Sequence, residues 1–312
     1  MLDISYNISP KLQEYLGKIE DLRKQILLTP ISQTLELHLK WEATFNRIYY
    51  SLKLTGNSTK KEDMLELLSE VAHKKINNEQ KIILQYKKSL DYIFQNWQGS
   101  QNAVDAKAII DLHKIIGNGR LRIPQAGLQY LLDYLQARIE NPIIQAAIVS
   151  IEMEKMQLFT EHNNLIAHLT ADLFLYKYGY DFKGFLAYET AWIEETKTFK
   201  ENHERALRSL SLTLWLEYFA KNILGQLETI AQSIKKPKQG TVDLRKSFWQ
   251  LNERQKSILN LLDQPQATIA NRQIQKKYRV SQITASRDLA KLTNLGCFYS
   301  HGKGRSVYYT KI

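Results

Sequence analysis

The sequence is poor in the features that build disulfides, metal clusters and membrane spans. Cys297 is the only cysteine among 312 residues, which excludes an internal disulfide and a metal site with several cysteine ligands. Hydrophobic residues make up 44% of the chain, but no apolar run approaches the roughly 20 residues that a membrane-spanning helix needs. The opening stretch, MLDISYNISPKLQEY, has neither the basic region nor the apolar core of a signal peptide. These absences predict a cytoplasmic protein with no membrane partner.

Acidic residues are scarce at one end of the chain. The whole sequence has 43 Lys and Arg against 32 Asp and Glu, a net charge of +11. From Lys235 to the end there are 16 basic and 4 acidic residues, a net charge of +12, so the preceding part carries 27 basic and 28 acidic residues. A basic segment joined to a nearly neutral body indicates that the C-terminal part meets a polyanion.

The alternating pattern of a strand is nearly absent before the basic segment. Thr59–Glu62 has the spacing of a capping box. Pro124 and Pro142 stand where the first turn of a helix accepts proline, and apolar residues recur with a helical period after each of them. The same period continues from Ile166 to Tyr176. The fold class is therefore mainly α, and residues 1–232 are expected to form an all-helical body.

Proline, glycine and lysines break this pattern at residues 233–245, where we expect a linker. Three helices are expected beyond it, at residues 253–262, at residues 270–278, and from Ser281 to about Leu295. The stretch CFYSHGKGRSVYY follows, and its two β-prone runs around glycines predict a hairpin. Three helices and a hairpin predict that residues 246–312 form a winged helix-turn-helix domain.

The stretch HKIIGNGR at residues 113–120 contains the letters of a phosphate-binding loop. Such a loop gains from a helix that starts directly after it, because the free N–H groups of the helix add positive potential. Here Pro124 follows closely and favours extended backbone before it. We therefore expect Gly117–Arg120 to be a tight turn between helices, with Arg120 and Arg122 on the surface.

A second stretch, QLFTEHNNLIAH at residues 157–168, stands between the helical segments Asn141–Ala147 and Asp172–Tyr180. Together these residues resemble the Fic proteins, whose signature H-P-F-x-(D/E)-G-N-G-R-x-x-R joins a helix that often begins with proline to a helix that ends near Gly-Tyr. Leu214–Phe219 resembles the late tryptophan-containing helix of that family, and a C-terminal winged helix is a common Fic appendage. The resemblance covers most of the chain. The signature also excludes His113 as the catalytic His. His113 lies four residues before Gly117, whereas the family's His lies five residues before the first glycine.

Three positions of the signature are retained: Phe159, Glu161 at the acidic metal-holding position, and Asn163. The others are replaced, with Gln157 at the catalytic His, His162 and Asn164 at the two glycines, and Leu165 and His168 at the two arginines. In the family, the His is the general base on a target hydroxyl, and the loop and arginines hold the phosphates of ATP while AMP is transferred. Gln157 cannot take up a proton near neutral pH, and Leu165 cannot bind phosphate. No catalytic residue and no cofactor are therefore expected. ATP and Mg²⁺ are expected only under the alternative hypothesis that the protein is a Fic-type enzyme.

Ser51, Thr55 and Gly56 resemble the inhibitory S-x-x-x-E-(G/N) motif of many Fic proteins, with Thr55 in place of the Glu. In the family this Glu pairs with the last Arg of the signature, and His168 stands at that Arg here. Loss of one partner alone would leave an unpaired charge in a semi-enclosed site, at a cost of about 1–3 kcal/mol. Replacement of both partners is the consistent outcome.

A metal site is a weak alternative for this region. His162 and His168 flank one turn and a half of expected helix, so their side chains point to opposite sides. We expect both to be exposed or capping histidines and Glu161 to be a solvated loop acid. Phe159 is expected in the core.

The last predicted helix has two faces. Ser281 is the expected cap, and Ala285, Leu289 and Leu292 point inward. The outer surface and its edges then carry Gln282, Ile283, Thr284, Ser286, Arg287 and Lys291. The residues expected to contact DNA are Gln282, Thr284, Ser286, Arg287 and Lys291 on this helix, and Lys303 and Arg305 at the wing tip.

These patterns predict a double-stranded DNA-binding protein that acts in transcriptional control. One winged helix reads only a short site, so a specific regulator is expected to be a homodimer. The helical body is then a dimerisation surface, or a sensor for a ligand or a protein partner. The rival readings are a Fic-type protein adenylyltransferase, for which His162 is the nearest base, a winged helix that docks a protein, and a scaffold that binds neither nucleotide nor DNA.

Overall fold

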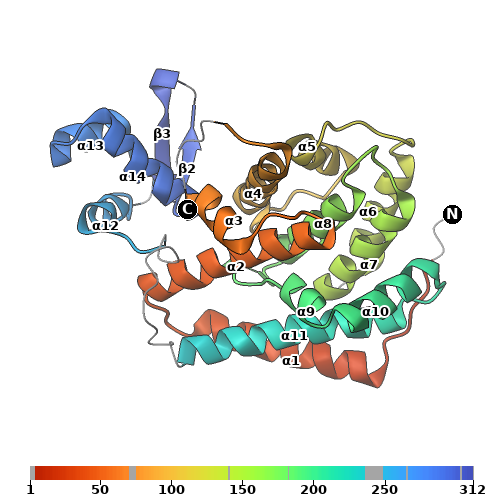
Figure 1. Ribbon diagram of the computed structural model, residues 1–312. Coiled ribbons are helices and arrows are strands. Elements are labelled where there is room, and N and C mark those ends of the chain that lie inside the picture. Colours follow the sequence, from red (N-terminus) through yellow and green to blue (C-terminus); the bar gives the residue numbers. More distant parts are fainter. Residues whose placement is uncertain are drawn as a thin grey trace. The chain divides into compact units, whose positions relative to one another are not determined.

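The computed structural model describes residues 4–69, 75–139, 141–181, 183–235, 249–264, 266–302 and 304–311, without the side chain of Arg305. Fourteen α-helices and three short strands lie within these ranges (Figure 1), so the mainly α fold class is confirmed. None of the helices described there is both long enough and apolar enough to span a bilayer.

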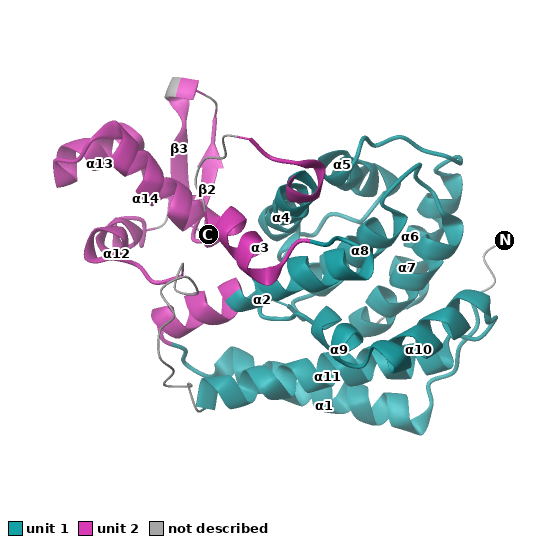
Figure 2. Ribbon diagram, viewed as in Figure 1, with its two compact units in different colours: residues 1–31, 42–58, 81–238 teal, residues 32–41, 59–80, 239–312 magenta. Residues whose placement is uncertain are grey.

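The chain forms two compact units, which Figure 2 shows in different colours. The first contains residues 1–31, 42–58 and 81–238, and the second contains residues 32–41, 59–80 and 239–312. The helices assigned mainly to the first unit are α1 (Pro10–Leu28), α4 (Asn78–Trp97), α5 (Ala106–Ile116), α6 (Ala126–Arg138), α7 (Pro142–Met156), α8 (Asn163–Lys177), α9 (Glu189–Glu194), α10 (Thr196–Arg208) and α11 (Thr213–Lys235). Helix α2 (Gln33–Leu54) contributes residues to both units, and α3 (Lys61–Ser69) belongs to the second.

The expected linker begins inside a helix. Because α11 extends to Lys235, residues 233–235 are helical, and residues 236–248 lie outside the described ranges. The second unit also takes in two stretches of the N-terminal half, which no composition shift in the sequence marks. The domain limits 1–232 and 246–312 stay a prediction.

Helices α7 and α8 form the buried centre of the first unit. Asn141 caps α7 by accepting the N–H of Ile143 at 2.9 Å, and Pro142 occupies the first turn. Both helices are apolar on nearly every side, which is the pattern of a helix surrounded by others. Helices α6, α10 and α11 pack on α7, and the indole N–H of Trp215 on α11 donates to the carbonyl of Ala147 at 2.8 Å. The loop at residues 157–162 is therefore held by the most buried part of the unit.

A charged network is buried beside α8. The guanidinium of Arg47 lies 2.7 Å from Asp181 and 3.7 Å from Asp172, and all three residues are almost fully buried. Glu189, also buried, accepts a hydrogen bond from the Ser51 hydroxyl at 3.4 Å. One cation thus faces three carboxyl groups in an apolar surrounding, where charge is costly.

This imbalance keeps one carboxyl group protonated. Burial, together with the nearby charge of Asp172, raises the pKa of Glu189 to about 8. Burial also raises the pKa of Asp172 to about 6, although Arg47 opposes the shift. Glu189 therefore carries its proton at neutral pH and acts as a neutral hydrogen-bonding group.

The second unit contains a small sheet and three further helices. They are α12 (Glu253–Asn260), β1 (Thr268–Ala270), α13 (Asn271–Tyr278), α14 (Gln282–Asn294), β2 (Phe298–His301) and β3 (Tyr308–Lys311), with a 3₁₀ turn at Gly304–Ser306. The strands are antiparallel in the order β1-β3-β2, and Tyr309 pairs with Ile269 on one side and Ser300 on the other. Three helices and a hairpin occur where the sequence predicts them. Strand β1 was not expected, because three residues are too few to show a period.

Buried apolar side chains of α12, β1, α13, α14 and β2 form the core of the second unit. Ala285, Leu289 and Leu292 are fully buried, as expected for the inner face of α14. Residues 32–41 also contribute, since the Lys40 amine donates to the Gly296 carbonyl at 2.9 Å and the His38 ring stacks on Trp249 at 4.7 Å.

We expect the free energy of unfolding to rise as the pH falls from about 8 to about 5. The reason is that folded Glu189 keeps its proton up to about pH 8, whereas the unfolded chain releases it above its ordinary pKa of 4.5. The gain is at most about 1.4 kcal/mol per pH unit for one proton. Urea unfolding of Glu189→Gln, which imitates the protonated group, should show a weaker pH dependence and higher stability than the unmodified protein at pH about 8.5. The exposed control Glu201→Gln should follow the unmodified protein, and an equal pH dependence in all three would contradict the assignment.

Candidate functional site

The loop between α7 and α8 has a non-glycine residue with a positive φ at each end. Gln157 ends α7 with φ 46°, and His162 precedes α8 with φ 56°, so both lie in the left-handed region. The Gln157 side chain turns back and donates to the carbonyl of Glu154 at 2.7 Å. The residue at the family's catalytic position thus caps its own helix.

Asn163 and Phe159 fix the shape of this loop. The Asn163 side chain accepts the N–H of Phe159 and donates to the carbonyl of Phe159, both at 2.9 Å. The Phe159 ring is buried and stacks on the His113 ring with centroids 3.8 Å apart and planes 4° apart. Two retained positions of the signature therefore have a structural role, and Phe159 lies in the core as expected.

The hydrogen bonds of His113 define its protonation state. Its Nδ1 accepts the N–H of Gly119 at 3.0 Å, so the proton lies on Nε2, which donates to the Glu161 carbonyl at 3.0 Å. Burial lowers the pKa of this imidazole. Because its one lone pair is already used, His113 is a neutral structural residue and not a general base.

The GNGR segment, residues 117–120, packs against the loop at residues 157–162. Thr160 donates its N–H to the Arg120 carbonyl at 3.2 Å, and Arg122 donates its N–H to the Leu158 carbonyl at 2.8 Å. Gly117 is required there, because a Cβ at this position would lie 2.8 Å from the His113 ring. Helix α6 begins only at Ala126, as expected from the absence of a helix start at the segment. The segment is thus a partner of the loop, and this pairing could not be predicted from the sequence.

Glu161 and His162 remain at the surface of this region. The Glu161 side chain is 44% exposed, as expected for a solvated loop acid, and its carboxylate lies 3.8 Å from the half-buried His162 ring. His162 stands at the N-cap position of α8 but forms no capping bond through its side chain. No cluster of His, Cys, Asp and Glu suited to a metal ion occurs among the residues that the structure describes.

The expectation of an exposed or capping His168 is wrong. His168 is 4% exposed, and its ring meets Trp192 edge-on at 5.1 Å. The Glu154 carboxylate lies 3.6 Å from His168 and 3.0 Å from His203, between the two imidazoles. Burial alone would raise the pKa of Glu154, but the hydrogen bonds from His168 and His203 lower it to about 2. The last arginine position of the signature is thus part of a buried cluster on α7, α8 and α10, and Leu165 is also buried.

The residues that resemble the inhibitory motif lie at the end of α2. Ser51 is buried, where its hydroxyl accepts from Tyr86 at 3.0 Å and donates to Glu189. Thr55 is exposed and donates to the Leu52 carbonyl at 2.9 Å, and Gly56 follows with φ 89°. Ser51 is therefore tied to the buried charged network, while His168 has taken Glu154 as its partner.

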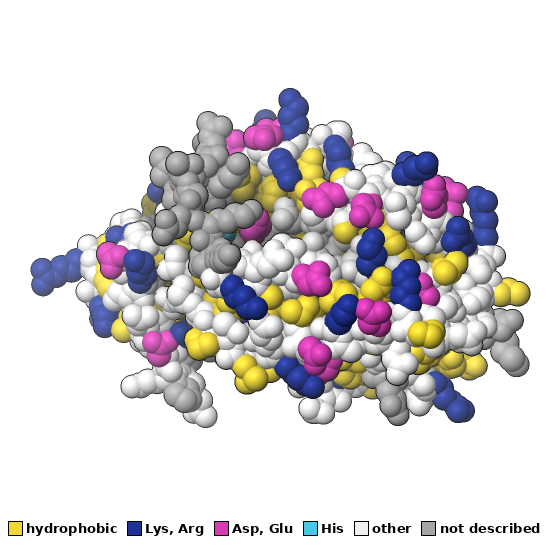
Figure 3. Space-filling model, turned by 90° about the horizontal axis from the view of Figure 1, so that it is seen from below, with side chains coloured by type: hydrophobic (Ala, Val, Ile, Leu, Met, Phe, Trp, Pro, Cys, Tyr) yellow, Lys and Arg dark blue, Asp and Glu magenta, His cyan; other side chains and the backbone are white. Residues whose placement is uncertain are grey.

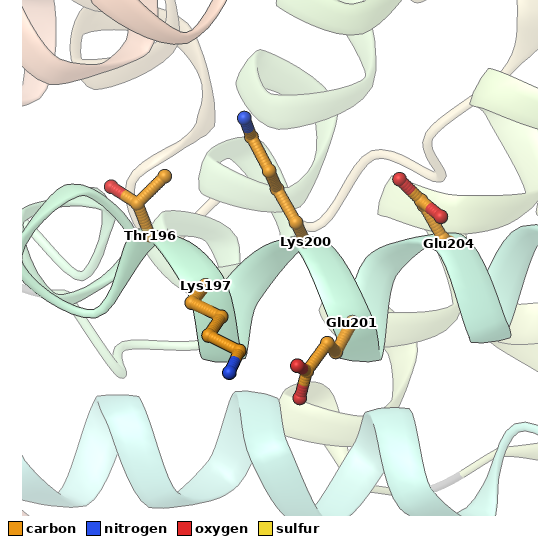
Figure 4. Close-up of a pocket in the computed structure, with 5 residues that line it drawn as sticks. All are labelled: Thr196, Lys197, Lys200, Glu201 and Glu204. Carbon is orange, nitrogen blue, oxygen red and sulfur yellow. The ribbon is translucent and has the colours of Figure 1, made fainter.

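A shallow depression on α10 is lined by charged side chains (Figure 4). Its lining residues are Thr196, Lys197, Lys200, Glu201 and Glu204, all from one exposed helix face. A lysine and a glutamate lie four residues apart twice there, Lys197 with Glu201 and Lys200 with Glu204, which is the arrangement of a solvated helix surface. The depression lacks the buried polar groups of a binding site, but it offers matched surface controls.

The N-terminal half of α14 presents polar side chains to solvent. Ser281 caps the helix by accepting the N–H of Thr284 at 3.2 Å, as expected. Gln282, Ser286 and Arg287 are exposed. Asn271 of α13 donates to the Ser286 hydroxyl at 2.8 Å, which fixes this side chain on the surface.

The other residues expected to contact DNA are placed differently. Thr284 is half-buried, with its hydroxyl 3.0 Å from that of Ser281. Lys291 is half-buried and donates to the Gln250 carbonyl at 2.6 Å, and burial lowers its pKa. Lys303 and the side chain of Arg305 lie outside the described residues. Among the expected cations, Arg287 is the one that the structure places on the exposed face.

The acidic residue of α14 points away from solvent. Asp288 is buried and accepts hydrogen bonds from Arg254 at 2.6 Å and from Gln255 at 2.9 Å. Its charge is thus neutralised inside the unit, and the exposed face of α14 carries no carboxylate. The charges of the first unit are distributed differently. Figure 3 shows Lys and Arg interspersed with Asp and Glu on the face where α1 and α11 lie.

Further cations that were not predicted as site residues lie next to α14. Arg272, Lys276 and Lys277 on α13 and Arg279 in the turn are all exposed. Their signal was the density of basic residues in a helix without an acid, NRQIQKKY. With Arg287 they add positive charge around the N-terminal half of α14.

The chain has the fold of Fic family proteins. Over 98% of its length it matches 97% of a Fic family protein from Desulfovibrio desulfuricans G20, with a TM-score of 0.61 and 14% identity. It also matches Fic-1 from C. elegans, with a TM-score of 0.54, 17% identity and 71% of each chain covered. A Fic domain containing signaling protein from Bacteroides thetaiotaomicron VPI-5482 is covered completely by 74% of this chain, with a TM-score of 0.53 and 15% identity. Neither a family model nor a curated protein matches the sequence. At such identities the likeness establishes the fold, so the expected Fic-like fold is confirmed.

We expect His162→Gly to raise the free energy of unfolding by up to about 1 kcal/mol. A side chain with a β-carbon is strained at positive φ, and glycine removes the strain. The control Lys200→Gly also introduces glycine, but at an exposed position inside α10. It should instead lower the free energy of unfolding by about 1 kcal/mol. Chemical denaturation of the two variants beside the unmodified protein measures both effects. Destabilisation of His162→Gly as large as that of Lys200→Gly would show that the loop does not hold His162 in the left-handed conformation.

Proposed function

We propose that the protein binds double-stranded DNA through its second unit and acts in transcriptional control. The observation that supports this most directly is the exposed face of α14, where Gln282, Ser286 and Arg287 stand without a neighbouring carboxylate. Helices α13 and α14, joined by a three-residue turn at 279–281, have the order of a helix-turn-helix, and β2 and β3 follow as a wing. A DNA partner also fits the cytoplasmic location that the sequence predicts.

In this proposal α14 enters the major groove with its N-terminal half. Gln282 can form two hydrogen bonds with adenine, and Arg287 can form two with guanine. Arg272 and the other cations of α13 and the turn then contact phosphates and set the position of the helix. The inward orientation of Asp288 favours DNA binding, because an exposed carboxylate on α14 would repel the phosphates of the DNA.

The first unit then joins two copies of the chain in a dimer, or senses a ligand or a protein. A homodimer would place two α14 helices on two half-sites and so lengthen the sequence that is read. The loop at 157–162 supports a non-catalytic role, because its backbone is hydrogen-bonded to the Asn163 side chain and to the backbone of residues 120–122. Neither Gln157, which caps α7, nor neutral His113 supplies a base.

We expect the affinity of the full chain for duplex DNA to fall steeply with salt. The slope of log K against log salt is about −0.9 per phosphate contacted. The double change Arg272→Ala, Arg287→Ala should make this slope less negative by up to about 2, since two cations are removed. Fluorescence anisotropy with a labelled random-sequence duplex, from about 50 to 200 mM salt, measures the slope. The control Lys197→Ala, Lys200→Ala removes the same charge from α10 and should leave the slope unchanged. Absent or salt-insensitive binding would contradict the proposal.

A second candidate function is protein adenylylation, and the shared Fic fold is the observation that favours it. Phe159, Glu161 and Asn163 stand at their signature positions, and Glu161 is exposed enough to hold a divalent cation. His162 would have to act as the base. Against this, Leu165 and His168 are buried where the signature has arginines, so no guanidinium group is available there for triphosphate.

We expect millimolar ATP with Mg²⁺ to leave the melting temperature unchanged, because a ligand stabilises only a protein that binds it. Incubation with labelled ATP, a divalent cation and cell lysate should likewise transfer no label. A rise in melting temperature that disappears in Glu161→Ala would establish nucleotide binding at the loop. Label transfer by the unmodified protein that is absent in Glu161→Ala would establish adenylylation. The DNA-binding experiment would then be judged separately.

A further inference from the structure

An isoleucine is exposed on the polar face of α14. Ile283 is 65% exposed at the second position of the helix, although the other large apolar side chains of α14, Leu289 and Leu292, are fully buried. Leaving such a side chain in water forgoes the free energy that its burial would contribute. Ile283 is therefore available to a partner that has an apolar group at this face.

The surroundings of Ile283 are polar and cationic. Ser286 and Arg287 follow at i+3 and i+4, so they lie on the same face one turn further along, and Gln282 precedes it. Ser286 is held in place by Asn271. A protein-docking face would need a contiguous apolar patch of a few hundred Å². A single apolar side chain among hydrogen-bonding groups and a cation fits a mainly polar partner with an isolated apolar group.

The major groove of DNA is such a partner. Its base edges offer hydrogen-bond donors and acceptors, and the C5-methyl group of thymine is their apolar feature. We propose that Ile283 recognises thymine by contacting this methyl group, and that it makes a T·A pair a fixed part of the sequence read by α14. The inference rests on the proposed DNA binding and goes further by naming a base and the residue that reads it.

Two properties of Ile283 suit this role. The N-terminal residues of a recognition helix are the ones that reach base edges, and Ile283 is in the first turn. A β-branched side chain in a helix strongly prefers one χ1 rotamer, so little conformational entropy is lost when it packs on a methyl group. Neighbouring Gln282 and Arg287 can meet adjacent base pairs, which would place the thymine inside a short mixed-sequence site.

The test replaces thymine by deoxyuridine, which lacks only the C5-methyl group. Duplexes are first selected from a random library with the full chain, and each invariant T of the enriched sequence is then replaced singly by U. We expect the affinity of the unmodified protein to fall about fourfold at one position, which corresponds to the roughly 0.8 kcal/mol gained by burying one methyl group. Ile283→Ala should bind the T and U duplexes equally, and Ile283→Val should keep part of the preference.

Each other outcome has a definite meaning. Arg287→Ala serves as the control, and it should weaken binding to the T and U duplexes by the same factor. An enriched sequence without an invariant T, equal affinity of the unmodified protein for both duplexes, or a preference for T that persists in Ile283→Ala would overturn the thymine proposal while DNA binding stands. If the full chain binds no duplex at any salt concentration, the proposed function itself fails. Equal affinities together with a change in oligomer size for Ile283→Ala would assign the side chain to a protein contact.

Discussion

The two hydrogen bonds between the Asn163 amide and the backbone of Phe159 are the constraint on which the loop depends. They hold Phe159 in place for the His113 ring, and this stack brings the GNGR segment against the loop. Each N–H or lone pair used in this assembly is no longer available to a ligand. These polar groups therefore serve the internal packing of the loop in a fold shared with Fic proteins.

Electrostatic arrangement differs between the two units in a way that follows from burial. The first unit encloses Arg47 with three carboxyl groups. The excess of negative charge is reduced because Glu189 stays protonated. The second unit pairs its buried Asp288 with Arg254, and the cations of α13 together with Arg287 of α14 are exposed. Helix α13 and the exposed face of α14 therefore carry cations without a carboxylate, whereas charges of both signs lie on the face where α1 and α11 lie.

Periodicity and capping residues predicted the elements well. Asn141 with Pro142, and Ser281, mark helix starts that the structure confirms, because capping is a local interaction that the sequence displays directly. The burial of His168 and its pairing with Glu154 could not be foreseen, since these residues meet only when α7 packs on α8. The same holds for His113 on Phe159 and for Lys291 on Gln250, which are separated by 46 and 41 positions in the chain.

The assignment of residues 32–41 to the second unit bears on how its parts can be separated. A fragment cut at the start of the basic segment would lack Lys40, the donor to the Gly296 carbonyl, and His38, the ring partner of Trp249. The severed piece would expose an indole and a carbonyl that the intact molecule covers. Proteolysis or gene dissection that aims at an autonomous tail should therefore carry the early part of α2 along with it.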